Sequence, residues 1–193
     1  MSGRHAPWLA LVVLSACASQ PVVVDPLPDA IHRAQREGRV TIVAFVDVEC
    51  EYSRALYRTL RQTLPGFPSA AVVPVFVPIR DRSVPTLRAL VCAQQQGQDF
   101  TDPMMNESDR SPEQVRVLAR RANLDLEALD RCAEDERSLQ RLRSDVGMAQ
   151  ALGVRGLPTF FVGNEMFRGV PSQEEIQASL QRASRETLLV SGR

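Results

Sequence analysis

The chain has 193 residues, 44% of them hydrophobic, and its 23 basic and 23 acidic side chains cancel to a formal net charge of zero. This length suits one globular domain with a substantial apolar core. Since there is no basic excess, nothing in the composition points to a polyanionic partner, and we expect no nucleic-acid binding.

The first sixteen residues predict an export signal. Arg4 supplies a positive charge, and residues 8–14 form an apolar run that is too short to span a bilayer. Residues 14–17, Leu-Ser-Ala-Cys, resemble the lipobox of bacterial lipoproteins, in which cleavage before the cysteine leaves its sulfur carrying a diacylglycerol. We therefore predict a signal peptide over 1–16 and lipidation of Cys17. An ordinary export signal with an incidental cysteine is the alternative.

The lipobox resemblance also implies a location. The domain is expected in the periplasm or cell envelope, held to a membrane by its lipid anchor, and Ala18 favours the outer membrane if the host is Gram-negative. Residues 17–28 are small, β-branched and proline-bearing, which predicts a tether that lets a folded domain, residues 29–193, stand off from the membrane. A short helix over 28–37, ended by Gly38, opens that domain.

A buried strand followed by a cysteine forms the centre of the predicted domain. Residues 40–46 are β-branched and aromatic without polar alternation, as in a strand buried on both faces. Cys50 follows at the carboxyl end of this strand, where open α/β sheets place their chemistry. It opens a helix that carries Leu56, Leu60 and Leu64 on one face. The helix N-terminus favours a thiolate at Cys50.

Some charged neighbours of Cys50 oppose its thiolate form and one favours it. Three nearby carboxylates oppose a thiolate here: Asp47, Glu49 and Glu51. Arg54, in the first turn of the helix, offsets part of this repulsion.

The rest of the chain predicts an α/β fold in the order β-α-β, helical insertion, β-β-α. A second strand occupies 70–79 and contains Pro74. The insertion covers 83–152, with helix starts signalled near Ser83, Ser111 and Asp125. Two strands separated by a Gly-Asn turn follow over 157–168, and a capping box at Ser172 opens the last helix. This order is that of the thioredoxin fold with an inserted helical subdomain.

Two segments carry a family resemblance. Residues 45–54, FVDVECEYSR, resemble the F-x-D-x-x-C-P-Y-C-R signature of DsbA-like thiol:disulfide interchange proteins. Residues 153–162, GVRGLPTFFV, are similar to their G-V-x-G-T-P-T-F-F-V loop, and the surroundings of Cys92 and Cys132 resemble the family's insertion.

The resemblance implies a set of site residues. Cys50, Ser53 and Pro158 would form the catalytic site, with Pro158 in the cis form beside Cys50. The Leu157 backbone would pair with an extended substrate as an added strand, and Tyr52 would also contact substrate.

Three departures from the family pattern shape the expected chemistry. Ser53 replaces the resolving cysteine, Glu51 replaces proline, and Leu157 replaces the usual Thr or Val. A thiolate at Cys50 could then attack a substrate disulfide, and a substrate thiol or a small thiol would resolve the mixed disulfide.

This chemistry predicts an isomerase or monothiol reductase that acts on extended cysteine-containing polypeptides and needs no cofactor. A glutathione- or sulfenate-handling reductase is a further option. The alternative from another class is a non-catalytic module that binds extended or unfolded chains along the Pro158 edge.

Cys92 and Cys132 both lie in the insertion. In an exported domain they predict a structural disulfide, provided that their Cα atoms come within about 7 Å. Two separate buried thiols are the alternative. A zinc site would require more ligands than the sequence offers, and His32 is interpreted as a surface helix residue, so no metal is expected.

Overall fold

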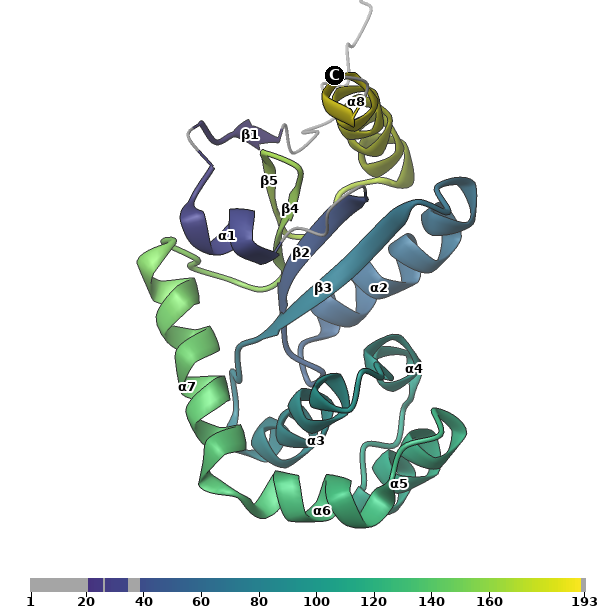
Figure 1. The fold of residues 1–193 in the computed structure, drawn as a ribbon, viewed down its shortest axis with the longest axis vertical. Coiled ribbons are helices and arrows are strands. Elements are labelled where there is room, and N and C mark those ends of the chain that lie inside the picture. The colour runs from purple at the N-terminus through teal and green to yellow at the C-terminus, as the bar shows by residue number, and fades with distance from the viewer. Residues whose placement is uncertain (1–20, 26, 35–38, 192–193) are drawn as a thin grey trace, which may run out of the picture.

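The computed structural model describes residues 21–25, 27–34 and 39–191. The predicted signal peptide, Cys17 and Gly38 lie outside these ranges. One mixed sheet runs through the described chain in the order β1-β5-β4-β2-β3 (Figure 1). Its strands are β1 (Val22–Val23), β2 (Val40–Val46), β3 (Ala70–Phe76), β4 (Thr159–Val162) and β5 (Glu165–Arg168).

The helices follow the predicted order. They are α1 (Asp29–Ala34), α2 (Glu51–Thr63), α3 (Val84–Gln95), α4 (Thr101–Asn106), α5 (Pro112–Arg121), α6 (Leu126–Glu134), α7 (Glu136–Ala151) and α8 (Gln173–Ser191), with short 3-10 turns at Leu64–Gly66 and Asp81–Ser83. The order β-α-β, helical insertion, β-β-α is therefore confirmed, and helices α3 to α7 make up the insertion (Figure 1).

Strand β2 is central, as predicted. It pairs in parallel with β3 and antiparallel with β4, and all seven of its residues are buried. Alternate side chains enter different cores because successive side chains of a strand point to opposite faces. Ile42 and Ala44 belong to the larger core with α2, α8 and the insertion, whereas Val43 and Phe45 pack with Ile31 of α1 and Ala149 of α7.

Several helix starts follow the predicted capping chemistry. The Ser111 hydroxyl accepts the Gln114 N–H at 3.3 Å, and the Asp125 carboxylate accepts the Ala128 N–H at 3.0 Å. At α8, Glu175 accepts the Ser172 N–H at 2.7 Å while the Ser172 hydroxyl accepts the Glu175 N–H at 3.2 Å. Both orphan donors of that capping box are satisfied.

Two elements differ from the prediction. The predicted tether over 17–28 contains strand β1, in which Val22 and Val23 pair antiparallel with Met166 and Glu165 of β5. A two-residue strand leaves no periodicity in a sequence, so only the partner strand reveals it. Helix α4 is likewise too short to produce a periodic pattern.

Strand β3 ends at Phe76, before the predicted end at residue 79, and strand β4 starts at Thr159. Since β3 pairs only with β2 in the described sheet, Pro74 lies on an edge strand, where a missing N–H is tolerated.

Asp145 of α7 joins the insertion to this edge. Its carboxylate accepts the backbone N–H of Phe76 at 3.2 Å and the Nε–H of Arg141 at 3.0 Å. The side chain is buried, and burial raises the pKa of Asp145 although the Arg141 guanidinium lowers it in part.

Candidate functional site

Cys50 lies directly before α2 and shortly after the end of β2, as predicted. It is the N-cap residue of α2, with φ −80° and ψ 117°, and its N–H donates to the Asp47 carbonyl at 3.1 Å. The thiol is free, and the residue is buried, with 7% of its surface exposed. The cysteine is therefore held at the positive end of a helix with most of its surface covered.

A loop from the far end of the chain meets this sulfur. Cys50 Sγ lies 3.7 Å from the Leu157 carbonyl oxygen, and the Leu157–Pro158 peptide is cis. The Pro158 carbonyl accepts the Gly169 N–H at 2.8 Å, and Thr159 Oγ1 donates to the Gly156 carbonyl at 2.9 Å. The loop beside the thiol is thus held by a backbone bond from Gly169 and by a side-chain bond within the loop itself.

Ser53 is buried one turn along α2 from Cys50. Its hydroxyl oxygen accepts the backbone N–H of Asp47 at 3.3 Å. This bond orients the Ser53 hydroxyl toward Asp47, at the start of the turn that precedes Cys50. A serine cannot form a disulfide, so Cys50 is left without a partner thiol on its own helix.

The carboxylate of Asp47 is buried and fully engaged. It accepts the Glu49 N–H at 2.8 Å, the Ile79 N–H at 2.6 Å and the Ser83 hydroxyl at 2.8 Å. Two of these donors come from the segment between β3 and α3. Asp47 therefore ties the turn before Cys50 to the entrance of the insertion.

Glu49 is bridged by two arginines. Arg110 Nε and Arg82 Nη2 each lie 3.1 Å from one of its carboxylate oxygens. The predicted opposition of three carboxylates to a thiolate therefore needs correction. Glu49 is compensated by guanidiniums that its sequence position could not reveal, whereas Glu51 is exposed on α2. Arg54 donates to the Val48 carbonyl at 3.0 Å, which holds its charge beside this turn.

Three apolar side chains lie near Cys50 in sequence, on the Pro158 loop, or next to its contact residue Gly169. Tyr52, two residues after Cys50, is 66% exposed, and Leu157 is half-buried against the smaller core. Val170 follows Gly169, whose N–H binds the Pro158 carbonyl, and is 36% exposed. Sequence reasoning did not single out Val170, since only the contact between Gly169 and Pro158 places it here.

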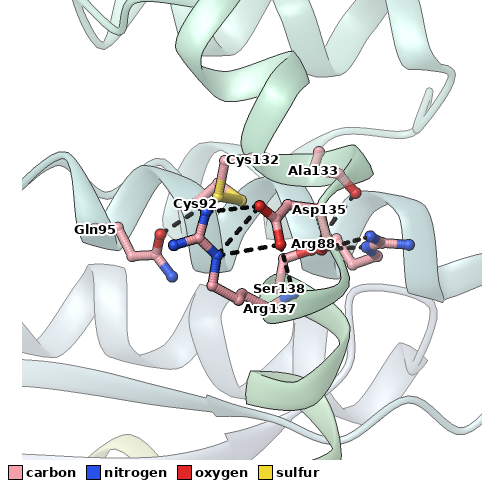
Figure 2. Close-up of polar contacts among 8 residues, drawn as sticks. All are labelled: Arg88, Cys92, Gln95, Cys132, Ala133, Asp135, Arg137 and Ser138. Carbon is pink, nitrogen blue, oxygen red and sulfur yellow. Dashed lines mark hydrogen bonds and ion pairs between the residues drawn. A yellow bond between two sulfur atoms is a disulfide. The ribbon is translucent and has the colours of Figure 1, made fainter.

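The two insertion cysteines lie away from this site. Cys92 of α3 and Cys132 of α6 form a disulfide with their Cα atoms 5.9 Å apart (Figure 2). Gln95 Oε1 lies 3.4 Å from Cys132 Sγ, and Asp135 and Arg137 lie beside the bridge. Hydrogen bonds from the Arg137 side chain and backbone lower the pKa of Asp135 to about 2.

The described residues include no group of three or more His, Cys, Asp or Glu side chains that could hold a metal ion. Within the same residues, no helix combines the length and apolar character needed to cross a bilayer.

Comparison with known proteins identifies a family. The model of the DSBA-like thioredoxin domain matches residues 86–181, a range that contains the insertion and Pro158. Among solved structures, a thioredoxin-like oxidoreductase from Silicibacter pomeroyi DSS-3 is 29% identical, with a TM-score of 0.66 over 79% of this chain and 90% of that one.

Other solved structures share the fold at lower identity. A periplasmic thioredoxin-like protein from Salmonella enterica serovar Typhimurium is 23% identical, with a TM-score of 0.63 over 84% of this chain and 98% of that one. The thiol-disulfide exchange protein alpha-DsbA2 from Wolbachia pipientis is 18% identical, with a TM-score of 0.63 over 77% of this chain and 84% of that one.

The curated relatives are much longer proteins. A protein named Na(+)/H(+) antiporter NhaA 3, from Salinispora tropica, is 30% identical over 168 residues, which are 84% of this chain. The chain spans about a quarter of that relative's length, since 26% of it is covered.

Proposed function

The chain belongs to the DsbA-like thioredoxin family, and from this we propose that it is a thiol:disulfide oxidoreductase whose chemistry runs through Cys50 alone. One observation carries the proposal. A free thiol caps the first helix after the central strand and faces the cis Leu157–Pro158 loop, while Ser53 occupies the place of a second cysteine.

The reaction balances without a second protein thiol. The Cys50 thiolate attacks one sulfur of a substrate disulfide, which forms a mixed disulfide and expels the other sulfur as a thiolate that takes up a proton. If another thiolate of the same substrate attacks that mixed disulfide, Cys50 is released and the substrate is isomerised. If small thiols resolve it instead, the substrate is reduced and those thiols are oxidised to a disulfide.

Substrate is expected to approach along the Leu157–Pro158 loop. An extended chain can add to exposed backbone groups as a strand, and the surrounding side chains then select among sequences. Tyr52 and Val170 are the exposed apolar groups that flank this route. Polypeptides with a cysteine beside apolar residues are therefore the substrate class that we propose.

Ser53→Cys tests this mechanism. The wild type should accumulate mixed disulfides on Cys50 and oxidise reduced peptides poorly, whereas Ser53→Cys should gain an internal disulfide and dithiol turnover. A matched control is Ser69→Cys, which adds an exposed thiol in the turn before β3, at the opposite end of the sheet from Cys50.

The readouts are mass spectrometry of trapped adducts and an insulin-reduction assay on the three proteins. If Cys50 forms no adduct and Ser53→Cys turns over no faster than Ser69→Cys, the redox mechanism is rejected.

The low exposure of Cys50, 7%, favours a second candidate. A cysteine so covered suits a module that binds extended or unfolded chains along the Pro158 edge without exchanging disulfides. Such a module would bind an unfolded polypeptide equally well with Cys50 or with Cys50→Ala, and it would form no adduct with either.

The proposed location is the cell envelope, with a lipid on Cys17 and the outer membrane as the site in a Gram-negative host. The lipobox-like residues 14–17 support it. Metabolic labelling with a fatty acid should mark the protein and be lost in Cys17→Ser. Labelling that survives the substitution would reject the lipid anchor.

A further inference from the structure

A cavity of about 260 Å³ lies inside the insertion, between helices α3, α5 and α6. Its walls are largely apolar and include Ala89, Val115 and Leu129. An apolar cavity of about 150 Å³ can hold benzene, so this one has room for a leucine-sized group together with a small polar head.

The polar residues that line the cavity are mainly cationic. Three arginines, Arg82, Arg110 and Arg116, accompany a single carboxylate, Asp130. Arg116 forms an ion pair with Asp130, so that cation is matched within the cavity wall.

The other two arginines share one carboxylate. Arg82 and Arg110 both bind Glu49, one at each oxygen. A guanidinium carries five N–H donors, and Arg82 contacts Glu49 through Nη2 while its side chain remains 65% exposed. Arg82 therefore keeps N–H donors and positive charge available in the lining of the cavity.

We propose that this cavity binds a carboxylate joined to a compact apolar group, as in a polypeptide that ends in leucine or in an N-acylated leucine. The apolar group lies against Val115 and Leu129, and the carboxylate binds Arg82 and Arg110. Guanidinium and carboxylate geometries match in a two-bond fork, which makes arginine well suited to this recognition.

The cavity is also connected to Cys50 through Glu49. A bound carboxylate competes with Glu49 for its two arginines, and Glu49 directly precedes Cys50. Occupancy of the cavity should therefore alter the rate at which Cys50 is alkylated. Binding itself does not require exchange at Cys50, so the site can be tested apart from the proposed function.

Isothermal titration of the full chain with N-acetyl-leucine and with N-acetyl-leucinamide tests the proposal. The acid should bind at least about tenfold more tightly than the neutral amide, because only the acid pairs with the arginines. Arg82→Gln should remove about tenfold of the acid's affinity and leave the amide unchanged. Ala133→Leu, which places a larger side chain in the cavity, should weaken the binding of both ligands.

Arg143→Gln on α7 is the matched control, since Arg143 pairs with Glu136 and does not line the cavity. Peptides that end in leucine, as acid and as amide, separate the two sources of the ligand. Binding by the peptide acid alone assigns the cavity to polypeptide C-termini, and equal binding by N-acetyl-leucine assigns it to small acids. Equal affinities for acid and amide, no effect of Arg82→Gln, or no saturable binding of either the peptide acid or N-acetyl-leucine up to about 10 mM would overturn the proposal.

Discussion

The chain uses cysteine in two contrasting regions. Cys50 is a free thiol at the start of a helix, where its sulfur faces a carbonyl of the Pro158 loop. Cys92 and Cys132 lie within helices of the insertion and are bonded to each other. The backbone position differs as much as the redox state, because only the helix start offers unpaired N–H groups to a thiolate.

The two regions differ in whether a cysteine is free to exchange disulfides. Cys50 has no thiol partner on its own helix, so any disulfide that it forms would be with a sulfur outside this helix. Cys92 and Cys132 are already bonded to each other, and Cys92 is only 1% exposed. We therefore interpret this disulfide as structural. Replacing Cys50 should then remove disulfide exchange, whereas replacing Cys92 and Cys132 should lower the stability of the fold.

The largest expected effect comes from Cys50→Ala. It should abolish every mixed-disulfide adduct, because the attacking sulfur is gone, and leave the melting temperature nearly unchanged. The double variant Cys92→Ala/Cys132→Ala should keep the adducts. Trapping with an alkylating agent followed by mass spectrometry measures both, and adducts that persist in Cys50→Ala would reverse the assignment.

The next effect is the stability that the insertion disulfide supplies. Its cysteines are 40 residues apart, and closing a loop of that length should stabilise the fold by about 3–4 kcal/mol in the chain-entropy model. Denaturant unfolding of the wild type and of Cys92→Ala/Cys132→Ala measures it. A thiol count above one for the residues after Cys17, taken in denaturant without reductant, would contradict the pairing.

Two aspartates of the insertion should give opposite pH dependences. Burial raises the pKa of Asp145 in the folded state, so its stabilisation is fully present below the unfolded pKa and is lost as pH rises through the folded value. The pKa of Asp135 is lowered to about 2, so its contribution is present above about pH 4 and is lost as pH falls toward 2.

Replacing each aspartate isolates its share of the pH dependence. Asp145→Asn should remove the loss of stability on raising the pH, and Asp135→Asn should reduce the loss on acidification. Urea unfolding across pH 2–8 measures both variants against the wild type. Identical pH profiles for the two variants would contradict the assigned directions.

The smallest expected effect is that of Glu49→Gln. It removes a carboxylate near Cys50 and frees two arginines, so alkylation of Cys50 should accelerate, by less than about fivefold, because one charge pair at about 4 Å in water is worth about 1 kcal/mol. Glu127→Gln, on the exposed face of α6, is the control and should leave the rate unchanged. A slower rate in Glu49→Gln would show that the arginine bridge positions the cysteine instead.

Local patterns determined how much could be predicted. Strand β2 and the start of α2 could be predicted because an apolar run and a helix-start signal each consist of consecutive residues. The arginines that bridge Glu49 come from positions 82 and 110, and Asp145 binds a strand 69 residues away. Such contacts depend on the path of the chain through the insertion, which no local periodicity records. The same holds for β1, whose only signal is its pairing with β5.

The pairing of Val22 with Met166 limits how far the edge of the sheet can lie from Cys17. If Cys17 carries the proposed lipid, only five peptide steps separate that residue from the paired edge of the sheet. At about 3.3–3.6 Å for each residue, this edge can rise no more than about 18 Å from the lipid-bearing residue. Under that proposal the β1 edge of the domain would stay close to the bilayer surface, so the domain would meet its polypeptide substrates beside a membrane.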